Sequence, residues 1–426
     1  MATSNLLHDQ TTLNAHTIAA TFANIGTAGN ELTATVSIAG TGSVVLLIVT
    51  TNINDNSTGD DTAKIRFTRA GSFITGSPIL QLFNDAQLDT NSLTMIHAVT
   101  GLSGSHTFAV QAEIIAGGPV IGSLQETSFQ IIEMTGATLE VDKSSTTADT
   151  TPTAGWENVG EGGAGELSGS FTPTAGAVQL MIANVNVTGS GDDRARLRMA
   201  VGGTQEGGTP EISSDASGET WDAGFMHVSI GNPASSAEFS CQWEDTVGGL
   251  ATGNQSGKQN TFQVVEIAAN YSLQTDIVTT GSGSSSGTSY ADVANMSDAT
   301  VAVDSTDSVV LALGIISPNT GADRAAVFRF DFNGTQFGPE FLWFADANAI
   351  GGTTSVYWAK TGLSGSSNDI ALQWLTYVGS GAALDADGYR ALQVLDLQNV
   401  AAGGVSIMNQ FQNGNVGSDL YSGTLQ

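Results

Sequence analysis

The chain repeats itself three times along its length, and this repeat restricts the possible fold more than any other feature. In each copy a polar, glycine-containing turn joins an apolar run to a strand with one arginine: 42–67, 176–199 and 307–330. The three arginines, Arg66, Arg198 and Arg329, are 132 and 131 residues apart. Because self-similarity at a fixed period indicates tandem copies of one folding unit, the sequence predicts three like units of about 131 residues.

Further anchors recur at the same period. They are Gln111, Gln242 and Gln373, the acidic residues Asp61, Asp193 and Asp323, and the closing strands 129–133, 262–266 and 392–396. We interpret the repeated Asp, Arg and Gln positions as structural, with each arginine orienting a loop or meeting a neighbouring unit.

The sequence predicts an all-β fold. Apolar and polar residues alternate at a period of two, as in 107–114, which is typical of strands. Turn sequences such as Gly-Ser-Gly at 189–191 separate the runs. About eight strands per unit suit a jelly roll or another two-sheet β-sandwich. A solenoid is disfavoured, because solenoid repeats are much shorter, roughly 20–50 residues.

The repeats set the expected boundaries. We predict an N-terminal arm at 1–18, three jelly-roll or β-sandwich domains at 19–137, 138–270 and 271–402, and a C-terminal docking tail at 403–426.

The charge of the chain excludes several kinds of partner. With 12 basic and 41 acidic residues, the net charge is −29 at pH 7. Such a chain lacks the basic footprint that binds phosphate backbones or anionic lipid, so we expect neither nucleic acid nor membrane as a partner. The first residues resemble no signal peptide, and we expect synthesis in a host cytoplasm. One cysteine, Cys241, cannot form an internal disulfide.

No catalytic constellation stands out, and the repeats act as an internal control. His97 and His227 occupy corresponding positions, but the third copy has Trp358 there. A position that accepts tryptophan is a packing position, so we expect no metal or acid–base role for these histidines. Neither a nucleophile elbow, nor a phosphate-binding Gly-Lys loop, nor an HExxH motif occurs. We therefore expect no enzyme and no cofactor.

One acidic loop is the best calcium candidate. Residues 55–61 crowd hard oxygen ligands into a short segment. The second copy keeps only Asp192 and Asp193, the third keeps only Asp323, and no suitably spaced glutamate follows. We therefore expect no metal site.

The closing half of each unit resembles the TNF-like, or complement globular-head-like, jelly rolls. In the first copy, 106–114 is followed by a Gly-rich hairpin and by 127–134; in the third, 369–374 is followed by Gly-Ser-Gly and by 390–397. Such modules recur in structural proteins of tailed bacteriophages. The resemblance implies trimeric binding or structural modules, and three copies on one chain would then form a pseudo-threefold trimer that is a monomer in solution.

A pseudo-threefold body suits the threefold and quasi-threefold positions of an icosahedral shell. We therefore expect a virion structural protein, a decoration (cement) protein on the external face of a phage capsid. Its partners would be the major capsid protein and neighbouring decoration subunits. The alternative is a tail fibre or receptor-binding subunit that holds a surface glycan on exposed aromatics such as Trp221 or Trp343. A glycan-active enzyme is a third, less favoured alternative.

The C-terminal segment 403–426 is expected to dock on a partner. It carries one charge, Asp419, and several apolar residues, among them Phe411, Leu420 and Tyr421. An extended segment of this kind can add a strand to an exposed sheet edge. The alternative, a disordered tail, remains open from the sequence.

Overall fold

The computed structural model describes residues 3–12, 16–26, 31–54, 61–84, 91–118, 120–121, 127–150, 155–160, 165–188, 193–213, 222–230, 235–247, 251–252, 257–267, 272–279, 289–303, 306, 308–316, 318–319, 324–345, 354–378, 383–384, 390–397 and 409–410. In these ranges the regular elements are β-strands. The described residues contain no helix that is long and apolar enough to cross a membrane.

Each repeat contains an inner and an outer antiparallel sheet. In the first repeat the inner order is β1 (Thr3–Thr12), β12 (Thr127–Thr135), β5 (Ser43–Asn54), β9 (Asn91–Val99), and the outer order is β4 (Thr33–Ile38), β10 (Gly104–Ala116), β6 (Asp61–Arg69), β8 (Ile79–Asn84).

The other two repeats have the same two sheets. In the second, the inner order is β13 (Thr138–Ser145), β25 (Asn260–Ile267), β17 (Val178–Val185), β22 (Ala223–Ile230), and the outer order is β16 (Ser168–Phe171), β23 (Ala237–Val247), β19 (Arg194–Val201), β21 (Glu211–Ser213). In the third, the inner order is β26 (Ser272–Thr279), β35 (Arg390–Leu397), β28 (Val309–Ile316), β32 (Thr354–Lys360), and the outer order is β27 (Ala291–Val303), β33 (Gly365–Val378), β30 (Arg324–Phe332), β31 (Thr335–Ala345).

Short strands extend or bridge these sheets. They are β2 (His16–Thr17), β3 (Ala23–Asn24), β7 (Ser72–Phe73), β11 (Val120–Ile121), β14 (Asp149–Thr150), β15 (Glu157–Asn158), β18 (Val187–Thr188), β20 (Thr204–Glu206), β24 (Ala251–Thr252), β29 (Pro318–Asn319), β34 (Ala383–Leu384) and β36 (Asn409–Gln410).

The sheet order is that of a jelly roll. The closing strand of each repeat lies between the first strand and the long apolar strand of the inner sheet, so chain segments far apart in sequence become neighbours. Two four-stranded sheets connected in this way form a jelly-roll sandwich. The all-β, jelly-roll prediction is confirmed.

The apolar runs of the inner sheets follow from burial on both faces. Every residue of β17, β25, β28 and β35 is buried. One face of each inner sheet packs inside its own sandwich, and the other meets the inner sheets of the other repeats. Strands buried on both faces read as continuous apolar runs rather than as alternating ones.

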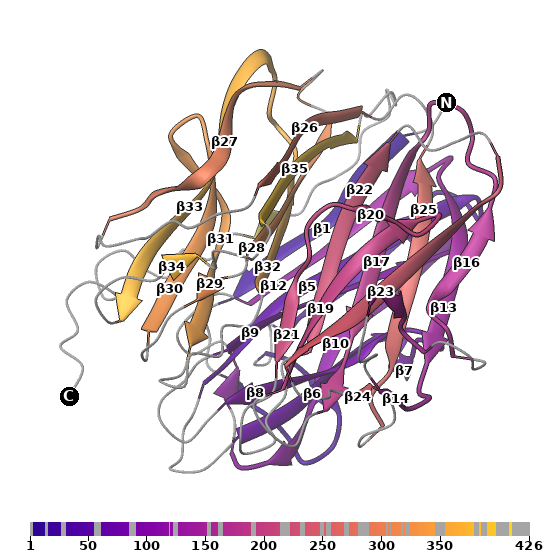
Figure 1. Ribbon diagram of the computed structural model, residues 1–426, viewed down its shortest axis with the longest axis vertical. Coiled ribbons are helices and arrows are strands. Elements are labelled where there is room, and N and C mark those ends of the chain that lie inside the picture. Colours follow the sequence, from indigo (N-terminus) through magenta and orange to yellow (C-terminus); the bar gives the residue numbers. More distant parts are fainter. Residues whose placement is uncertain are drawn as a thin grey trace.

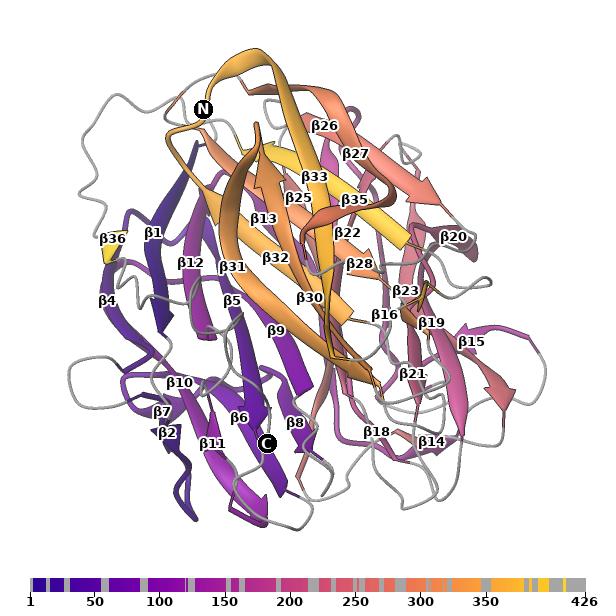
Figure 2. The same ribbon diagram turned by 90° about the vertical axis from the view of Figure 1, so that its left-hand side faces the viewer.

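The three repeats share one hydrophobic cluster. Its members come from all three inner sheets and include the equivalent residues Ile96, Met226 and Tyr357. Figures 1 and 2 show the third repeat, coloured orange to yellow, beside the first and second. The three inner sheets therefore meet in one shared core, around what we call the pseudo-threefold axis.

The prediction of an N-terminal arm at 1–18 was wrong for residues 3–12. These residues form β1, which pairs with β12 from Thr3↔Thr135 to Thr12↔Thr127. β13 and β26 pair in the same way with the closing strands of their repeats. The segment is mostly polar and shows no strand-like alternation, so its sequence did not predict a strand. Its pairing with β12 is made by the backbone, and Leu6 is its contribution to the shared core.

Candidate assembly site: the pseudo-threefold axis and its seams

The strands β9, β22 and β32 end the three inner sheets and contact one another at the axis. At this point Gly224 of β22 lies against β9 of the first repeat, where a Cβ atom would come within 2.2 Å of the Thr94 carbonyl oxygen. Glycine is required here because the two backbones approach too closely for a side chain.

A glutamine joins the second repeat to the first. The Gln263 side chain accepts a hydrogen bond from the Ala98 amide (N···Oε1 2.8 Å) and donates one to the Ala98 carbonyl (Nε2···O 2.8 Å). Ala98 lies on β9, whose pairing partner in the sheet is β5. A primary amide offers one donor and one acceptor side by side, as a strand residue does. Gln263 thus supplies the hydrogen bonds that the edge of the sheet would otherwise lack.

The equivalent glutamines complete a ring. Gln393 of the third repeat bonds in the same way to Val228 of the second (2.7 and 2.8 Å). Gln130 of the first repeat bonds to Ala359 of the third (2.9 and 2.7 Å). All of these bonds are buried, and an unpaired buried backbone group costs about 1–3 kcal/mol. The ring therefore fixes the three repeats in one cyclic order, first to third, third to second and second to first.

Other contacts across the axis differ among the three interfaces between neighbouring repeats, which we call seams. The Asn184 side chain accepts from the Ile96 amide (3.1 Å) and donates to the Ile96 carbonyl (2.7 Å). At the equivalent position of the second repeat, the Met226 amide donates to the Tyr357 hydroxyl oxygen (2.7 Å). Burial raises the pKa of Tyr357, so the hydroxyl stays neutral. The three seams are alike in their glutamines and different in their surroundings.

The structure brings together the repeated arginine and glutamine of each outer sheet. Arg66 lies opposite Gln111 and donates from Nε and Nη2 to its Oε1 (3.2 and 2.9 Å). The other two pairs are Arg198 Nε to Gln242 Oε1 (2.8 Å), and Arg329 Nε and Nη2 to Gln373 Oε1 (3.1 and 3.0 Å). The residues that the repeat marks as equivalent thus make the same contact three times.

An aromatic ring covers each of these guanidinium groups. The ring centroids of Phe22, Trp156 and Tyr290 lie 3.7, 4.4 and 3.6 Å from the Cζ atoms of their arginines. The glutamine Nε2 atoms donate in turn to Asn24, Asn158 and Asp292. Each cluster therefore binds the segment that enters the sandwich to the outer sheet, which is a structural role.

The repeated aspartates do not behave alike. The Asp61 carboxylate is buried and accepts a hydrogen bond from the Gly118 amide (2.5 Å). Asp193 is partly exposed just before β19, and Asp323 lies outside the described residues. Of the calcium candidate 55–61, only Asp61 is described. Within the described part of the chain, no three or more His, Cys, Asp or Glu side chains form a group that could hold a metal ion.

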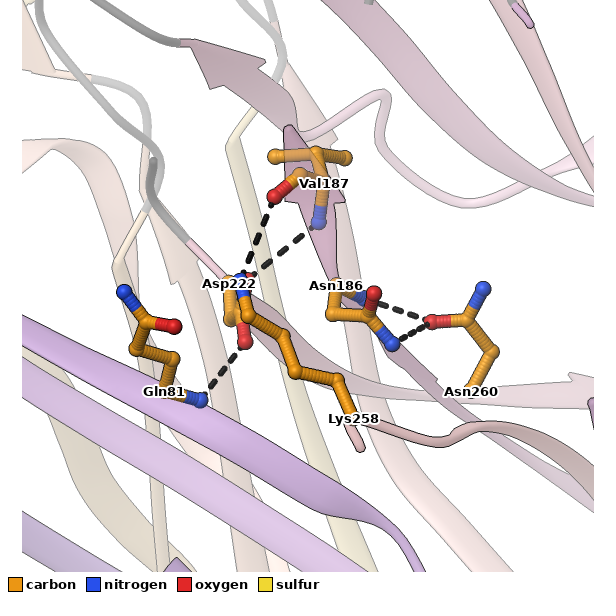
Figure 3. Close-up of polar contacts among 6 residues, drawn as sticks. All are labelled: Gln81, Asn186, Val187, Asp222, Lys258 and Asn260. Atoms are coloured by element: carbon orange, nitrogen blue, oxygen red, sulfur yellow. Dashed lines mark hydrogen bonds and ion pairs between the residues drawn. The ribbon is translucent and has the colours of Figure 1, made fainter. Parts of the chain in front are cut away.

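The seam between the first and second repeats also contains a buried ion pair (Figure 3). Lys258 Nζ lies 3.4 Å from Asp222 Oδ1, and both side chains are almost completely buried. Asp222 also accepts from the Val187 amide (3.2 Å) and from the Gln81 amide of the first repeat (2.6 Å). Burial raises the pKa of Asp222, whereas Lys258 and the two amides lower it.

Two further contacts border this pair. Gln259, next to Lys258, exchanges backbone hydrogen bonds with Ile79 of the first repeat (3.3 and 3.1 Å). Within the second repeat, Asn186 donates to Asn260 from its backbone amide (2.7 Å) and from its side chain. The ion pair therefore belongs to a polar network in which Asp222 and Gln259 bond to the first repeat.

The buried histidines and the cysteine lie inside the sandwiches. Desolvation lowers the pKa of His97 to about 3 and that of His227 to about 4, so both rings are neutral at physiological pH. Gly207 lies against the His227 ring, as Gly338 lies against the Trp358 ring. Burial raises the pKa of the Cys241 thiol. These environments suit packing residues.

Several residues named from the sequence do not line a described surface. Trp343, a candidate for glycan contact, is buried in the third sandwich, so this interpretation was wrong. Because side chains on a strand point alternately to its two faces, Trp343 on β31 points into the core of the third repeat. Trp221, Phe411, Leu420 and Tyr421 lie outside the described residues. Of the tail, β36 is described, and it pairs in parallel with Asp9 and Gln10 of β1.

Sequence reasoning missed the three axial glutamines. Gln130, Gln263 and Gln393 are each the fourth residue of the closing strands β12, β25 and β35, and each lies within an apolar run. A polar residue retained three times inside such a run was the available signal, because a buried amide needs partners. Its partners lie in other repeats, and their identity could not be read from the strand itself.

No family model and no curated protein match the chain. Among solved structures, the chain is similar to one described as "The Triple Jelly Roll Fold and Turret Assembly in an Archaeal Virus", with 11% identity and a TM-score of 0.19 over 93% of this chain and 90% of that one. A structure of Sulfolobus turreted icosahedral virus has 11% identity and a TM-score of 0.17 over 90% of this chain and 89% of that one. A structure of PNGF-II has 7% identity and a TM-score of 0.25 over 81% of this chain and 100% of that one.

Proposed function

We propose that this chain is a virion structural protein, a decoration (cement) protein that binds the external face of a phage capsid near threefold or quasi-threefold positions. The observation that carries the proposal is the closed ring of Gln130, Gln263 and Gln393 around a shared core. One chain thereby builds a body with pseudo-threefold symmetry, which matches the symmetry of three capsid subunits around such a position.

The fusion of three modules has a physical advantage for such a role. Gathering three separate subunits costs translational and rotational freedom, estimated at about 4–15 kcal/mol for each association. Covalent linkage removes most of this cost by raising the effective concentration of the modules. A monomer can then bind a threefold position at low free concentration. We expect no enzymatic activity and no cofactor.

The C-terminal segment 403–426 is proposed to provide much of the contact with the major capsid protein and neighbouring decoration subunits. The whole chain carries a net charge of −29, so its faces repel other acidic surfaces. The segment itself carries one charge and the apolar residues Phe411, Leu420 and Tyr421. Apolar contacts and backbone pairing can therefore act where charge does not.

The experiment is to mix the purified protein with undecorated capsids and to image the particles. We expect density for one chain at each occupied threefold position. Deletion of 403–426 should leave the melting temperature nearly unchanged and reduce occupancy strongly. Full occupancy by the truncated chain contradicts the docking role of the tail, and absence of the full-length chain from capsids contradicts the decoration role.

The alternative of a tail fibre or receptor-binding subunit makes a different prediction about mass. A fibre built from three intertwined chains would scatter light as a trimer, whereas the pseudo-trimer is a monomer of 43.6 kDa. The shared core, in which the repeats lie side by side, favours the monomer. A measured mass near three times that of the chain would favour the fibre.

A further inference from the structure

Three similar repeats joined by similar interfaces can pair within one chain or with repeats of another copy. Each glutamine contact is heterologous, since the donor surface of one repeat meets a different surface of the next. A heterologous contact closes into a ring only when the right units meet, and otherwise continues from molecule to molecule. Because all three repeats carry the same glutamine, the ring alone does not distinguish a repeat of the same chain from one of another copy.

Among the ion pairs between residues that the structure describes, Asp222–Lys258 is the one in which both side chains are almost completely buried. By strand register, the described residue of the first repeat that is equivalent to Asp222 is the uncharged Ser92. The fold of a repeat therefore does not require a charge at this position. Breaking a buried pair costs several kcal/mol, although replacing both charges with apolar groups is often neutral. A pair of this kind is better explained by specificity than by stability.

The strand that faces Asp222 also differs among the repeats. The first repeat offers Gln81, and the register gives Glu211 and Leu342 as its equivalents. If the second repeat of another copy took the place of the first repeat, it would bring Glu211 beside the buried Asp222 carboxylate. Like charges repel strongly where water is excluded. A third repeat would bring the apolar cluster of Val327, Leu342 and Leu375 against the polar network.

We propose that Asp222 and Lys258 form a recognition element, which lets the second repeat accept the first repeat as its neighbour and rejects repeats of other copies. The neutral Gln81 completes this element, since its amide satisfies Asp222 and its side chain adds no charge. The pair thereby keeps the molecule a monomer instead of a domain-swapped chain of molecules. Such discrimination through an unfavourable wrong contact is common in specific interfaces.

The first test is refolding of the full chain from denaturant at high protein concentration, followed by native mass spectrometry. The wild-type chain should return to a monomer of 43.6 kDa. The double variant Asp222→Leu/Lys258→Met should remain folded, while the ratio of dimers and larger species to monomer rises about tenfold, the factor that a loss of about 1.4 kcal/mol in discrimination produces.

The matched control is Glu140→Gln/Lys143→Gln, which removes one charge of each sign from exposed positions of β13. It should refold as a monomer. If the Asp222→Leu/Lys258→Met variant also refolds as a monomer, whether more or less stable than the wild type, the pair is only structural and the proposal is overturned.

A second test addresses the mechanism of rejection. Gln81→Glu places in the correct seam the carboxylate that a wrong neighbour would bring, and it should lower the melting temperature and increase oligomers. Asp222→Asn in the same chain should restore at least half of both effects, because the repulsion needs two carboxylates. Strictly additive effects of the two substitutions would overturn the proposed mechanism.

Discussion

Gln263 and Ala98, which belong to different repeats and are separated by 165 residues, exchange two hydrogen bonds as if they were paired residues of one sheet. The contact is side chain to backbone, so it satisfies the edge of β9 without adding a strand. An edge satisfied in this way offers no template for another chain, which is the usual hazard of exposed strands.

Replacing an axial glutamine should destabilise the whole body. Gln263→Ala leaves the amide and carbonyl of Ala98 buried without these partners, and we expect a loss of about 2–4 kcal/mol in the free energy of unfolding. Urea denaturation measures this loss. Gln130→Ala and Gln393→Ala should cost similar amounts, because the three contacts are equivalent.

The control for this series is Gln336→Ala, which removes an exposed hydrogen bond between two residues of β31. It should change the stability by less than about 0.5 kcal/mol. Equal effects of the buried and exposed glutamines would show that the ring does not hold the repeats together.

Gly338→Ala should be far more damaging than Gly334→Ala. Both glycines have positive φ, but a Cβ at Gly338 would lie 2.4 Å from the Trp358 ring, whereas nothing lies within 4 Å of one at Gly334. The backbone strain common to both is about 1 kcal/mol, and overpacking adds about 1–3 kcal/mol for Gly338. Thermal unfolding of the two variants gives the comparison, and equal melting temperatures would contradict it.

The stability of the protein should fall in mildly acidic solution, partly through His227. Burial lowers the pKa of His227 to about 4 from its ordinary 6.5. Since the folded state disfavours the charged ring, the contribution of His227 is complete above pH 6.5 and is lost as the pH falls from 6.5 through 4. The two pKa values correspond to about 3 kcal/mol.

The measurement is the free energy of unfolding at pH 7 and at pH 4.5 for the wild type and His227→Leu. The variant should lose less stability between the two values, with His106→Leu, on the outer sheet, as the control. Parallel losses in wild type and His227→Leu would contradict the burial of a neutral ring.

Arg329→Lys should weaken the outer-sheet cluster of the third repeat. Lysine keeps the charge but loses the planar group that stacks under Tyr290 and bonds twice to Gln373. We expect a loss of about 1 kcal/mol, seen as a lower urea midpoint. Arg198→Lys should behave in the same way, and a midpoint unchanged in both variants would mean that the clusters contribute nothing to stability.

The sequence by itself determined the repeat, the all-β class and the equivalence of the arginine and glutamine positions. These follow from local patterns, since period-two alternation depends on which side of a strand is buried, and Arg66 and Gln111 face each other wherever their two strands pair.

Tertiary structure alone decided which residues hold the three repeats together. Val228, Ala98 and Ala359 accept glutamine amides because the edges of three inner sheets meet at one axis, and a backbone group has no side-chain signature. Residues 3–12 likewise look like an arm and become a strand, because a closing strand about 125 residues later offers its edge. The sequence records what each strand buries, whereas the partner of each buried polar group depends on which surfaces the folded chain brings together.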